Sequence, residues 1–599
     1  MRTSLALVHH ANQYLITNGY DNREGIEAVV GTPKSASGLR HVLELHERFG
    51  VPLNLHISGT LIEAIAWHRR EFLDYVKHLV KAGLIELVGS CYGQNIMRFF
   101  GPEYNRSQLN EELVLYRLHL DADPHSVKTF WPPERVWETR RTAPVLRDAK
   151  LLNDGYRYVI LDDRLLLSPT DSLNPRKAYD DSGEWNPELF KMHEIEDGLG
   201  LVAFPIGTRL RRSIPPRADE DWEQVQSELE ALLVHSGTES NTSLLAVYAD
   251  DMEKVAGIGE WGPDGPKHYE SFLSWLTGRQ WVEPVRLTEW AELNEVSAKR
   301  KIERGTFQEL AVAFEAGEGY ERWFLASDWA PYRGYFNWAE ARVRQARAQG
   351  GDTALLELAD KQLLVANWET AWHTPAAGPH GDPHQNGHAS PWARALTSHS
   401  RHAAVTADAA LWMSKSDRQP KAFALDIDND GETEVVIANQ ALFVVLTPKW
   451  GGRITAMFSV AGRHGAMVIG NPCDDWNWME ELNRYMDVPR NHPGALADAG
   501  FEHDEYEAEI SVLEDRAVVR LRNIQENSQA FGLVKEIELR SGDAWVNVRY
   551  LLPQPLGQVQ TELGLSPDYL GLLRCGAAYL ETITFGDLRG CKAGSVSVY

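Results

Sequence analysis

The stretch Phe72–Val88, FLDYVKHLVKAGLIELV, contains one complete step from a helix to a strand. Its first apolar residues recur with helical spacing, at Phe72, Tyr75, Val76, Leu79 and Val80. Gly83 then ends the helix, and the apolar run 84–88 has the length and composition of a buried strand. A helix followed directly by a buried strand predicts a parallel β/α fold.

The same alternation continues through the first ~270 residues and favours a β/α barrel over an open sheet. Further strands are expected at Val51–Ile57, Tyr156–Leu161, Leu201–Pro205 and Leu244–Tyr248. From residue 273 the pattern turns helical and charged, and from 415 it alternates as in β structure. The later strands are expected at Glu434–Asn439, Leu442–Thr447, Glu507–Val512, Ala517–Arg522, Val534–Leu539 and Trp545–Tyr550. We therefore expect a barrel at 1–272, a helical region at 273–414 that completes its cleft, and a β-sandwich at 415–599.

Composition excludes several classes of protein. The chain has 599 residues, of which 43% are hydrophobic and 24% charged, as in globular proteins. Its net charge of −25 disfavours nucleic acid and anionic membranes as partners and fits a neutral substrate. Four scattered cysteines form no CxxC pair, which argues against a zinc ribbon or a disulfide framework. The N-terminus does not resemble a signal peptide and no apolar run reaches membrane-spanning length, so we expect a soluble, cytoplasmic protein. The sequence does not predict its oligomeric state.

Acidic residues follow two of the apolar runs. Glu134 lies within Thr129–Trp137, TFWPPERVW, between two tryptophans, and Leu244–Lys254, LLAVYADDMEK, ends its strand in Asp250 and Asp251. In a parallel β/α fold such residues gather at the carboxyl ends of the strands. Two carboxyl groups, one protonated and one ionised, are what glycosidic cleavage requires. The alternative is a structural role, in which Glu134 pairs with Arg135 or Asp250 caps a helix.

Several segments, in order, resemble glycoside hydrolase family 57, in its 4-α-glucanotransferase and α-amylase branch. WPPERVW at 131–137 resembles the W-x-x-E-R-V-W motif, and YADDMEK at 248–254 resembles the D-D-G-E-K motif. HISG at 56–59, LDD at 161–163 and FPIGTRLRRSIP at 204–215 resemble further segments of the branch, and WGGRI at 450–454 resembles its C-terminal domain. The resemblance implies a distorted (β/α)7 TIM-type barrel. It also implies that Glu134 is the nucleophile and Asp251 the general acid/base.

The resemblance further implies a set of substrate-binding residues: His9, His10, Gln94, Trp131, Arg135, Trp137, Asp250, Trp261, Trp368, Trp372 and His373. His9 is expected to keep the role of the family's first histidine, while His10 either joins it or points to the opposite face of its strand. Arg135 is expected to favour the ionised form of Glu134. Trp368 and Trp372 are spaced to share one helix face, where they would stack on glucosyl rings or pack in the core.

The sequence also departs from the family pattern. Ala11 and Asn12 follow His10 where the family has H-x-H-Q-P, Gln94 stands where the branch has Glu, and Met252 replaces Gly in D-D-G-E-K. These changes keep both carboxylates but bear on the natural substrate and the rate. His380, His384 and His388 lie in a Gly/Pro-rich stretch that cannot be helical throughout, so we expect a substrate-side loop there in preference to a metal site.

A calcium-loop pattern lies in the expected β domain. Asp426, Asp428, Asp430 and Glu434 occupy positions 1, 3, 5 and 9, with Gly431 at position 6. We expect a structural calcium ion there, remote from the chemistry; the alternative is an acidic hairpin turn. No cofactor is expected for catalysis.

Together these features predict a retaining enzyme that cleaves α-1,4-glucosidic bonds in α-glucans or maltooligosaccharides, either a 4-α-glucanotransferase or an enzyme of mixed activity. Two alternatives stay open, an α-amylase-type hydrolase and a catalytically silent α-glucan-binding protein. A deacetylase on a similar barrel fits least, because its early D-D and H-x-x-x-H pairing is absent from the sequence.

Overall fold

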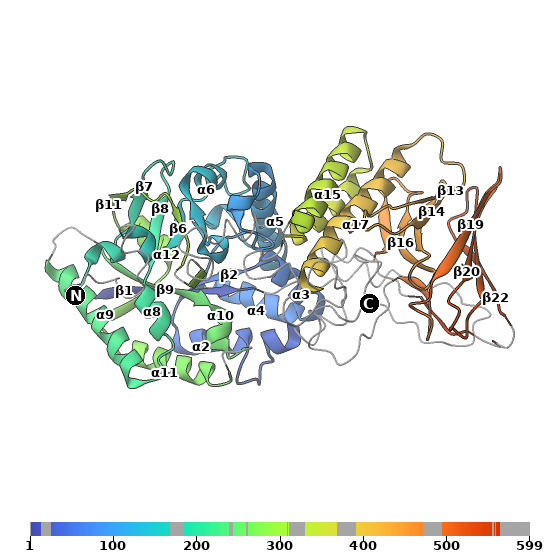
Figure 1. The fold of residues 1–599 in the computed structure, drawn as a ribbon. Helices are drawn as coiled ribbons and strands as arrows, with labels where there is room; N and C mark the ends of the chain where they lie inside the picture. The colour runs from blue at the N-terminus through green and yellow to red at the C-terminus, as the bar shows by residue number, and fades with distance from the viewer. Residues whose placement is uncertain are drawn as a thin grey trace. The chain divides into compact units, whose positions relative to one another are not determined.

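The structure, a computed structural model, describes residues 2–12, 26–167, 185–238, 243–258, 262–296, 298–307, 309–310, 330–367, 391–470, 494–553, 556 and 559–563 (Figure 1). Contacts divide these residues into two compact units. The β/α unit contains those up to 310 together with Asn367, and the β-sandwich unit contains 330–366 and those from 391 onward. The bounds of the three domains expected from the sequence stay a prediction.

Seven parallel strands follow one another around the β/α unit. They are β1 (Thr3–Ala11), β2 (Leu53–Ile57), β3 (Ile85–Leu87), β4 (Thr129–Phe130), β6 (Tyr158–Asp162), β8 (Val202–Ile206) and β9 (Leu245–Asp251). Pairing joins β9, β1, β2 and β3 in one sheet and β4, β6 and β8 in another. The two sheets meet twice: the Gly89 N–H donates to the Thr129 carbonyl at 2.9 Å, and the Gly207 N–H donates to the Val247 carbonyl at 2.9 Å. The ring of strands confirms the predicted barrel.

Shorter strands complete this unit. β10 (Val282–Val285) pairs with the first residues of β1, β7 (His193–Ile195) lies between β8 and β11 (Ala298–Arg300), and β5 (Trp137–Glu138) pairs with β12 (Arg304–Gly305). Its helices are α2 (Leu39–Phe49), α3 (Gly59–His68), α4 (Arg70–Lys81), α5 (Pro102–Leu120), α6 (Thr139–Leu146), α8 (Thr208–Ser213), α9 (Asp219–Thr238), α10 (Met252–Ala256), α11 (Gly265–Thr277) and α12 (Leu287–Leu293). The predicted helix and strand of 72–88 are thus α4 and β3.

The barrel is filled by alternate side chains of its strands, because successive residues of a strand point to opposite faces. This inner cluster includes Ala6 and Val8 of β1, Tyr158 and Ile160 of β6, Phe204 and Ile206 of β8, and Val247 and Ala249 of β9. The intervening residues Leu5 and Leu7 are equally buried, since they face the surrounding helices. Both faces of each strand are therefore apolar, as expected for a parallel sheet covered on both sides.

The second unit combines three helices with two antiparallel sheets. The helices are α15 (Ala330–Ala348), α16 (Thr353–Val365) and α17 (Pro391–Ser414). One sheet contains β13 (Lys421–Leu425), β14 (Glu434–Ala438), β15 (Leu442–Thr447), β16 (Arg453–Ser459), β17 (Ala466–Ile469), β18 (Ala495–Asp498) and β23 (Thr561–Leu563). The other contains β19 (Tyr506–Val512), β20 (Arg516–Asn523), β21 (Val534–Arg540) and β22 (Asn547–Leu551).

One apolar core joins these two sheets. It takes Val435 and Ile437 from β14 and Val444 from β15, and it takes Val519 and Ile537 from β20 and β21 of the other sheet. On β20, buried residues alternate with more exposed ones, which is the pattern of a sheet with one face on a core. Two antiparallel sheets over a shared core confirm the predicted sandwich. Within the described ranges, no helix is both long enough and apolar enough to cross a membrane.

Candidate active site

Polar residues continue the inner rows of the barrel at the carboxyl ends of its strands. His10 follows Ala6 and Val8 on β1, Asp162 follows Tyr158 and Ile160 on β6, and Asp251 follows Val247 and Ala249 on β9. His10 and Asp251 are register partners on adjacent strands. We call this end of the barrel the mouth, and it is where parallel β/α barrels carry their chemistry.

Glu134 lies at the mouth in a strained turn directly after β4. Its backbone is left-handed, with φ 50° and ψ 23°, inside the short turn Pro133–Arg135. The Thr306 hydroxyl donates to the Glu134 carbonyl at 2.8 Å and holds this conformation. The neighbouring residues Pro133 and Arg135 are buried, whereas Glu134 is only half-buried. A non-glycine residue in this region costs on the order of 1–3 kcal/mol and is concentrated at functional sites.

Arg135 is fixed beside the turn by two contacts. Its Nη1 lies 3.5 Å from Oδ2 of Asp162, and its guanidinium lies 3.9 Å from the centroid of the Phe307 ring. Burial raises the pKa of Asp162, while the charge of Arg135 opposes that shift. Arg135 therefore pairs with the acidic group of the next barrel strand, a partner that the sequence did not indicate.

His10 lies at the mouth beside Trp131. Its ring stacks on Trp131 at 5.0 Å and 7°, and its Nδ1 lies 2.7 Å from Nδ1 of His56. Nε2 of His56 lies 2.7 Å from Oε1 of Glu112. Burial lowers the pKa of His56 to about 3 and raises the pKa of Glu112, so both groups favour their neutral forms. Trp131 is 3% exposed, and it packs against both His10 and the inner cluster of the barrel.

Asp250 and Asp251 face different surroundings although they are adjacent. Asp250 is buried, with Oδ2 3.0 Å from Nζ of Lys254 and Oδ1 3.6 Å from Nη1 of Arg211. Asp251 is exposed, at the start of α10. The two residues alternate across β9, which places Asp251 at the end of the inner row and Asp250 in an ion-pair network.

The structure places three predicted substrate-binding residues in packed surroundings. His9 is fully buried on the outer row of β1, and its Nε2 lies 2.7 Å from the Tyr269 hydroxyl of α11. Trp137 is fully buried and its indole N–H donates to the Thr139 hydroxyl at 2.8 Å. Gln94 is buried and its side chain donates to the carbonyl of Cys91. His9 differs most from expectation, because the alternation along β1 gives the mouth to His10.

Several predicted residues lie outside the described part of the chain: Trp261, Trp368, Trp372 and His373, and the loop histidines His380, His384 and His388. Their roles stay predictions.

Four residues near the mouth had no predicted site role: Asp162, His56, Arg211 and Glu112. Asp162 could have been predicted from the sequence, because it ends an apolar run just as Asp251 does. Glu112 had none, because it lies within α5 and only the fold brings it to His56.

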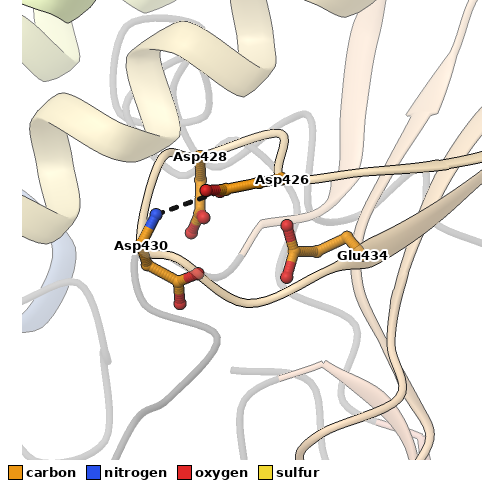
Figure 2. Close-up of side chains that lie close together, drawn as sticks. All are labelled: Asp426, Asp428, Asp430 and Glu434. Atoms are coloured by element: carbon orange, nitrogen blue, oxygen red, sulfur yellow. Dashed lines mark hydrogen bonds between the residues drawn. The ribbon is translucent and has the colours of Figure 1, made fainter.

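The four residues of the predicted calcium loop lie together in the β-sandwich unit, with one ligand atom from each within 4.8 Å of the others (Figure 2). The N–H groups of Asp430 and Gly431 each donate to the Asp426 carboxylate at 3.0 Å. Arg401 of α17 contacts both Asp428 and Asp430, the latter at 2.9 Å. Oxygen donors at this spacing suit calcium, while Arg401 already offsets part of their charge. Calcium binding stays a prediction.

By its fold and by the residues of the mouth, the protein is a β/α-barrel protein with carboxyl groups at the carboxyl ends of its strands. Residues 14–299 match the family model "Glycosyl hydrolase family 57". This confirms the resemblance found in the sequence.

Named relatives carry two activities. The chain is 26% identical over 449 residues to a 4-alpha-glucanotransferase of Thermococcus litoralis, covering 70% of this chain and 60% of that protein. It is 33% identical over 224 residues to an alpha-amylase of Pyrococcus horikoshii, covering 37% of this chain and 30% of that protein. The chain thus spans less than two thirds of the length of either relative. The crystal structure of 4-alpha-glucanotransferase from Thermococcus litoralis aligns with a TM-score of 0.49 at 20% identity, covering 92% of this chain and 85% of that chain.

Proposed function

We propose that this protein cleaves α-1,4-glucosidic bonds with retention of configuration, with Glu134 as nucleophile and Asp251 as general acid/base. The observation that carries the proposal is the strained, half-buried turn of Glu134 at the carboxyl end of β4. The left-handed backbone of Glu134, whose carbonyl accepts a hydrogen bond from Thr306, follows the carboxyl end of β4. The alternation along β9 supports Asp251 over Asp250 as its partner, since it places Asp251 at the end of the inner row beside His10.

The proposed reaction has two steps. The Glu134 carboxylate attacks the anomeric carbon, the bond from that carbon to the glycosidic oxygen breaks, and Asp251 transfers its proton to the leaving oxygen. The ionised Asp251 then takes a proton from an acceptor hydroxyl, whose oxygen displaces Glu134 from the anomeric carbon. Glu134 is thereby regenerated as a carboxylate and Asp251 as an acid.

The acceptor decides the name of the activity. Water as acceptor makes the protein an amylase, and the 4-hydroxyl of a second glucan makes it a 4-α-glucanotransferase. We propose transfer or mixed activity. Trp368 and Trp372 are predicted to stack on glucosyl rings, and they would hold an acceptor sugar where water would otherwise attack. Relatives bear both names, so an α-amylase-type hydrolase is the alternative.

A silent α-glucan-binding protein is a second candidate. The departures at Ala11, Gln94 and Met252 favour it, since Met252 is a fully buried side chain where the family has glycine.

The test is incubation of the full chain with maltopentaose and separation of the products by length. Products both longer and shorter than five glucoses support transfer, and shorter products alone support the hydrolase. Glu134→Gln should abolish turnover while binding of the sugar persists. Glu303→Gln is the matched control, because Glu303 is an exposed carboxylate of the same unit. Unchanged maltopentaose, still bound by the protein, would contradict catalysis and favour the silent binder.

A further inference from the structure

A hollow of about 690 Å³ lies on the outer, helical face of the β/α unit. Its walls come from α9, α11 and the last residue of α2. It is lined by three aromatic residues, Phe49, Trp222 and Trp275, and by polar residues that include Gln226, Glu270 and Ser274. A volume of roughly 300–1,000 Å³ is typical of sites for small organic ligands.

The indole rings of this hollow are held in place by their neighbours and are partly covered by them. The rings of Trp222 and Trp275 lie 5.8 Å apart at 53°, so they form two inclined faces. Phe272, fully buried, supports Trp275 from within the unit at 6.2 Å and 18°. The guanidinium of Arg279 lies 4.9 Å from the centroid of Trp275. Trp222 and Trp275 are both only half-buried, so part of each ring is accessible to a ligand.

The polar groups of the hollow suit a neutral ligand. The carboxylate of Glu270 lies 2.5 Å from the guanidinium of Arg48, so its charge is compensated. Gln226 and Ser274 add an amide and a hydroxyl, which both donate and accept hydrogen bonds. Aromatic faces beside such groups match a sugar ring, which has apolar C–H faces and a rim of hydroxyls. The net charge of −25 argues against a polyanion as the occupant.

The hollow is separate from the mouth. Tyr269 of α11 is fully buried and lies 2.7 Å from His9 on the outer row of β1. Glu270, next along the same helix, faces the hollow. Helix α11 therefore stands between the hollow and the strands, and the mouth lies at the strand ends.

We propose that this hollow is an accessory binding site for an α-glucan chain, which stacks on Trp222 and Trp275. This inference rests on the proposed function, because it assigns to the hollow the same polymer that the mouth would cleave. The site would hold long glucans on the protein without contributing to the reaction on short ones.

The test compares binding and turnover in the full chain. Binding to soluble amylose is measured by affinity electrophoresis in the Glu134→Gln background, so that no polymer is consumed. Trp222→Ala with Trp275→Ala should weaken binding about tenfold, a change within the range of aromatic contacts. Turnover of maltopentaose, measured without the Glu134 change, should stay within about twofold of the parent, since the hollow lies outside the mouth. Trp545→Ala is the matched control, because Trp545 is 59% exposed in the other unit.

A second variant guards against misfolding. Ser274 is exposed on α11, so Ser274→Arg fills the hollow without removing a core residue, and it should also weaken amylose binding. Amylose binding that neither variant changes would overturn the inference while the proposed function stands. A lowered oligomeric state in either variant, with amylose binding intact, would overturn it in favour of a second copy of this chain. Maltopentaose left unchanged, together with amylose binding that requires both tryptophans, would overturn the proposed function and leave this site supported.

Discussion

At the scale of single residues, neighbours in the sequence have opposite surroundings. His9 packs under α11 while His10 stacks on Trp131 at the mouth. Asp250 is locked by Lys254 while Asp251 is exposed. The proposed reaction therefore depends on which of the two neighbours, His9 or His10 and Asp250 or Asp251, faces the interior of the barrel at the end of its strand.

The role of Asp251 can be separated from that of Glu134 by the leaving group. Asp251→Asn should lower turnover of maltopentaose by about 10²–10⁴-fold, because the sugar leaving oxygen requires a proton. A nitrophenyl maltooligosaccharide needs no such proton, so its first cleavage step should be affected far less. The burst of nitrophenol, measured by stopped flow, checks this.

The matched variant is Asp250→Asn. Equal losses of Asp251→Asn on both substrates would contradict a general acid at this position.

His46 predicts a pH dependence of stability. Its Nδ1 donates to the Val51 carbonyl at 2.8 Å, and burial lowers the pKa of His46 to about 4. In the unfolded chain the imidazole of His46 titrates near pH 6.5, so as the pH falls the unfolded state binds this proton before the folded state does. The free energy of unfolding therefore decreases by up to about 1.4 kcal/mol per pH unit between about pH 6.5 and pH 4. The stability contributed by neutral His46 is thus present above pH 6.5 and lost below it.

The variant His46→Gln removes this group. Its stability deficit relative to the parent, measured by urea unfolding at pH 7.5, 6.5 and 5.5, should shrink as the pH falls. The exposed His78→Gln is the control. A deficit that stays constant over this range would show that His46 is not held neutral.

At the scale of elements, the loop between β13 and β14 shows how local sequence and a distant helix compete. Asp426 closes the turn through backbone N–H groups, as its spacing alone predicts. Arg401 reaches the same cluster from α17, which nothing in the loop indicates.

Calcium should raise the thermal midpoint of protein first treated with a chelator, since a ligand at about 100 times its Kd contributes about 2.7 kcal/mol. Asp426→Asn should abolish the rise, while Asp417→Asn, an exposed residue outside the cluster, should keep it. Differential scanning calorimetry with and without calcium measures both. Equal midpoints under the two conditions would mean that Arg401 stabilises the cluster without a metal ion.

At the scale of the whole molecule, two separate cores predict two unfolding events. The inner cluster of the barrel and the core of the sandwich share no residue. Calorimetry should therefore show two transitions, because units with their own cores seldom unfold as one.

A variant at Lys535 would identify which calorimetric transition belongs to the β-sandwich unit. It is fully buried, with Nζ 2.8 Å from Asp498 and 2.7 Å from the carbonyls of Gly451 and Leu496. Lys535→Ala leaves the buried Asp498 without its cation and should destabilise this unit by about 3–5 kcal/mol. One transition should move down and the other stay. The control is Lys449→Ala, because Lys449 forms an ion pair at the surface. A single transition that moves as a whole would contradict independent units.

The order of the elements could be predicted from local patterns in the sequence. The helix and strand of 72–88, the acids that follow the apolar runs, and the spacing of Asp426 to Glu434 each depend on residues close together in the chain. The segments shared with the family indicated the barrel, and the ring of strands confirms it.

Which side chains share the mouth could not be predicted from local patterns, because it depends on how the strands and helices pack. Both faces of a covered parallel strand are apolar, so hydrophobicity could not tell whether His9 or His10 faces the interior. The pairing of Arg135 with Asp162, the approach of Glu112 to His56 and the hollow between α9 and α11 join residues far apart in sequence. Their meeting is set by strand order and helix packing, because distances across a fold depend on the closed barrel and not on separation along the chain.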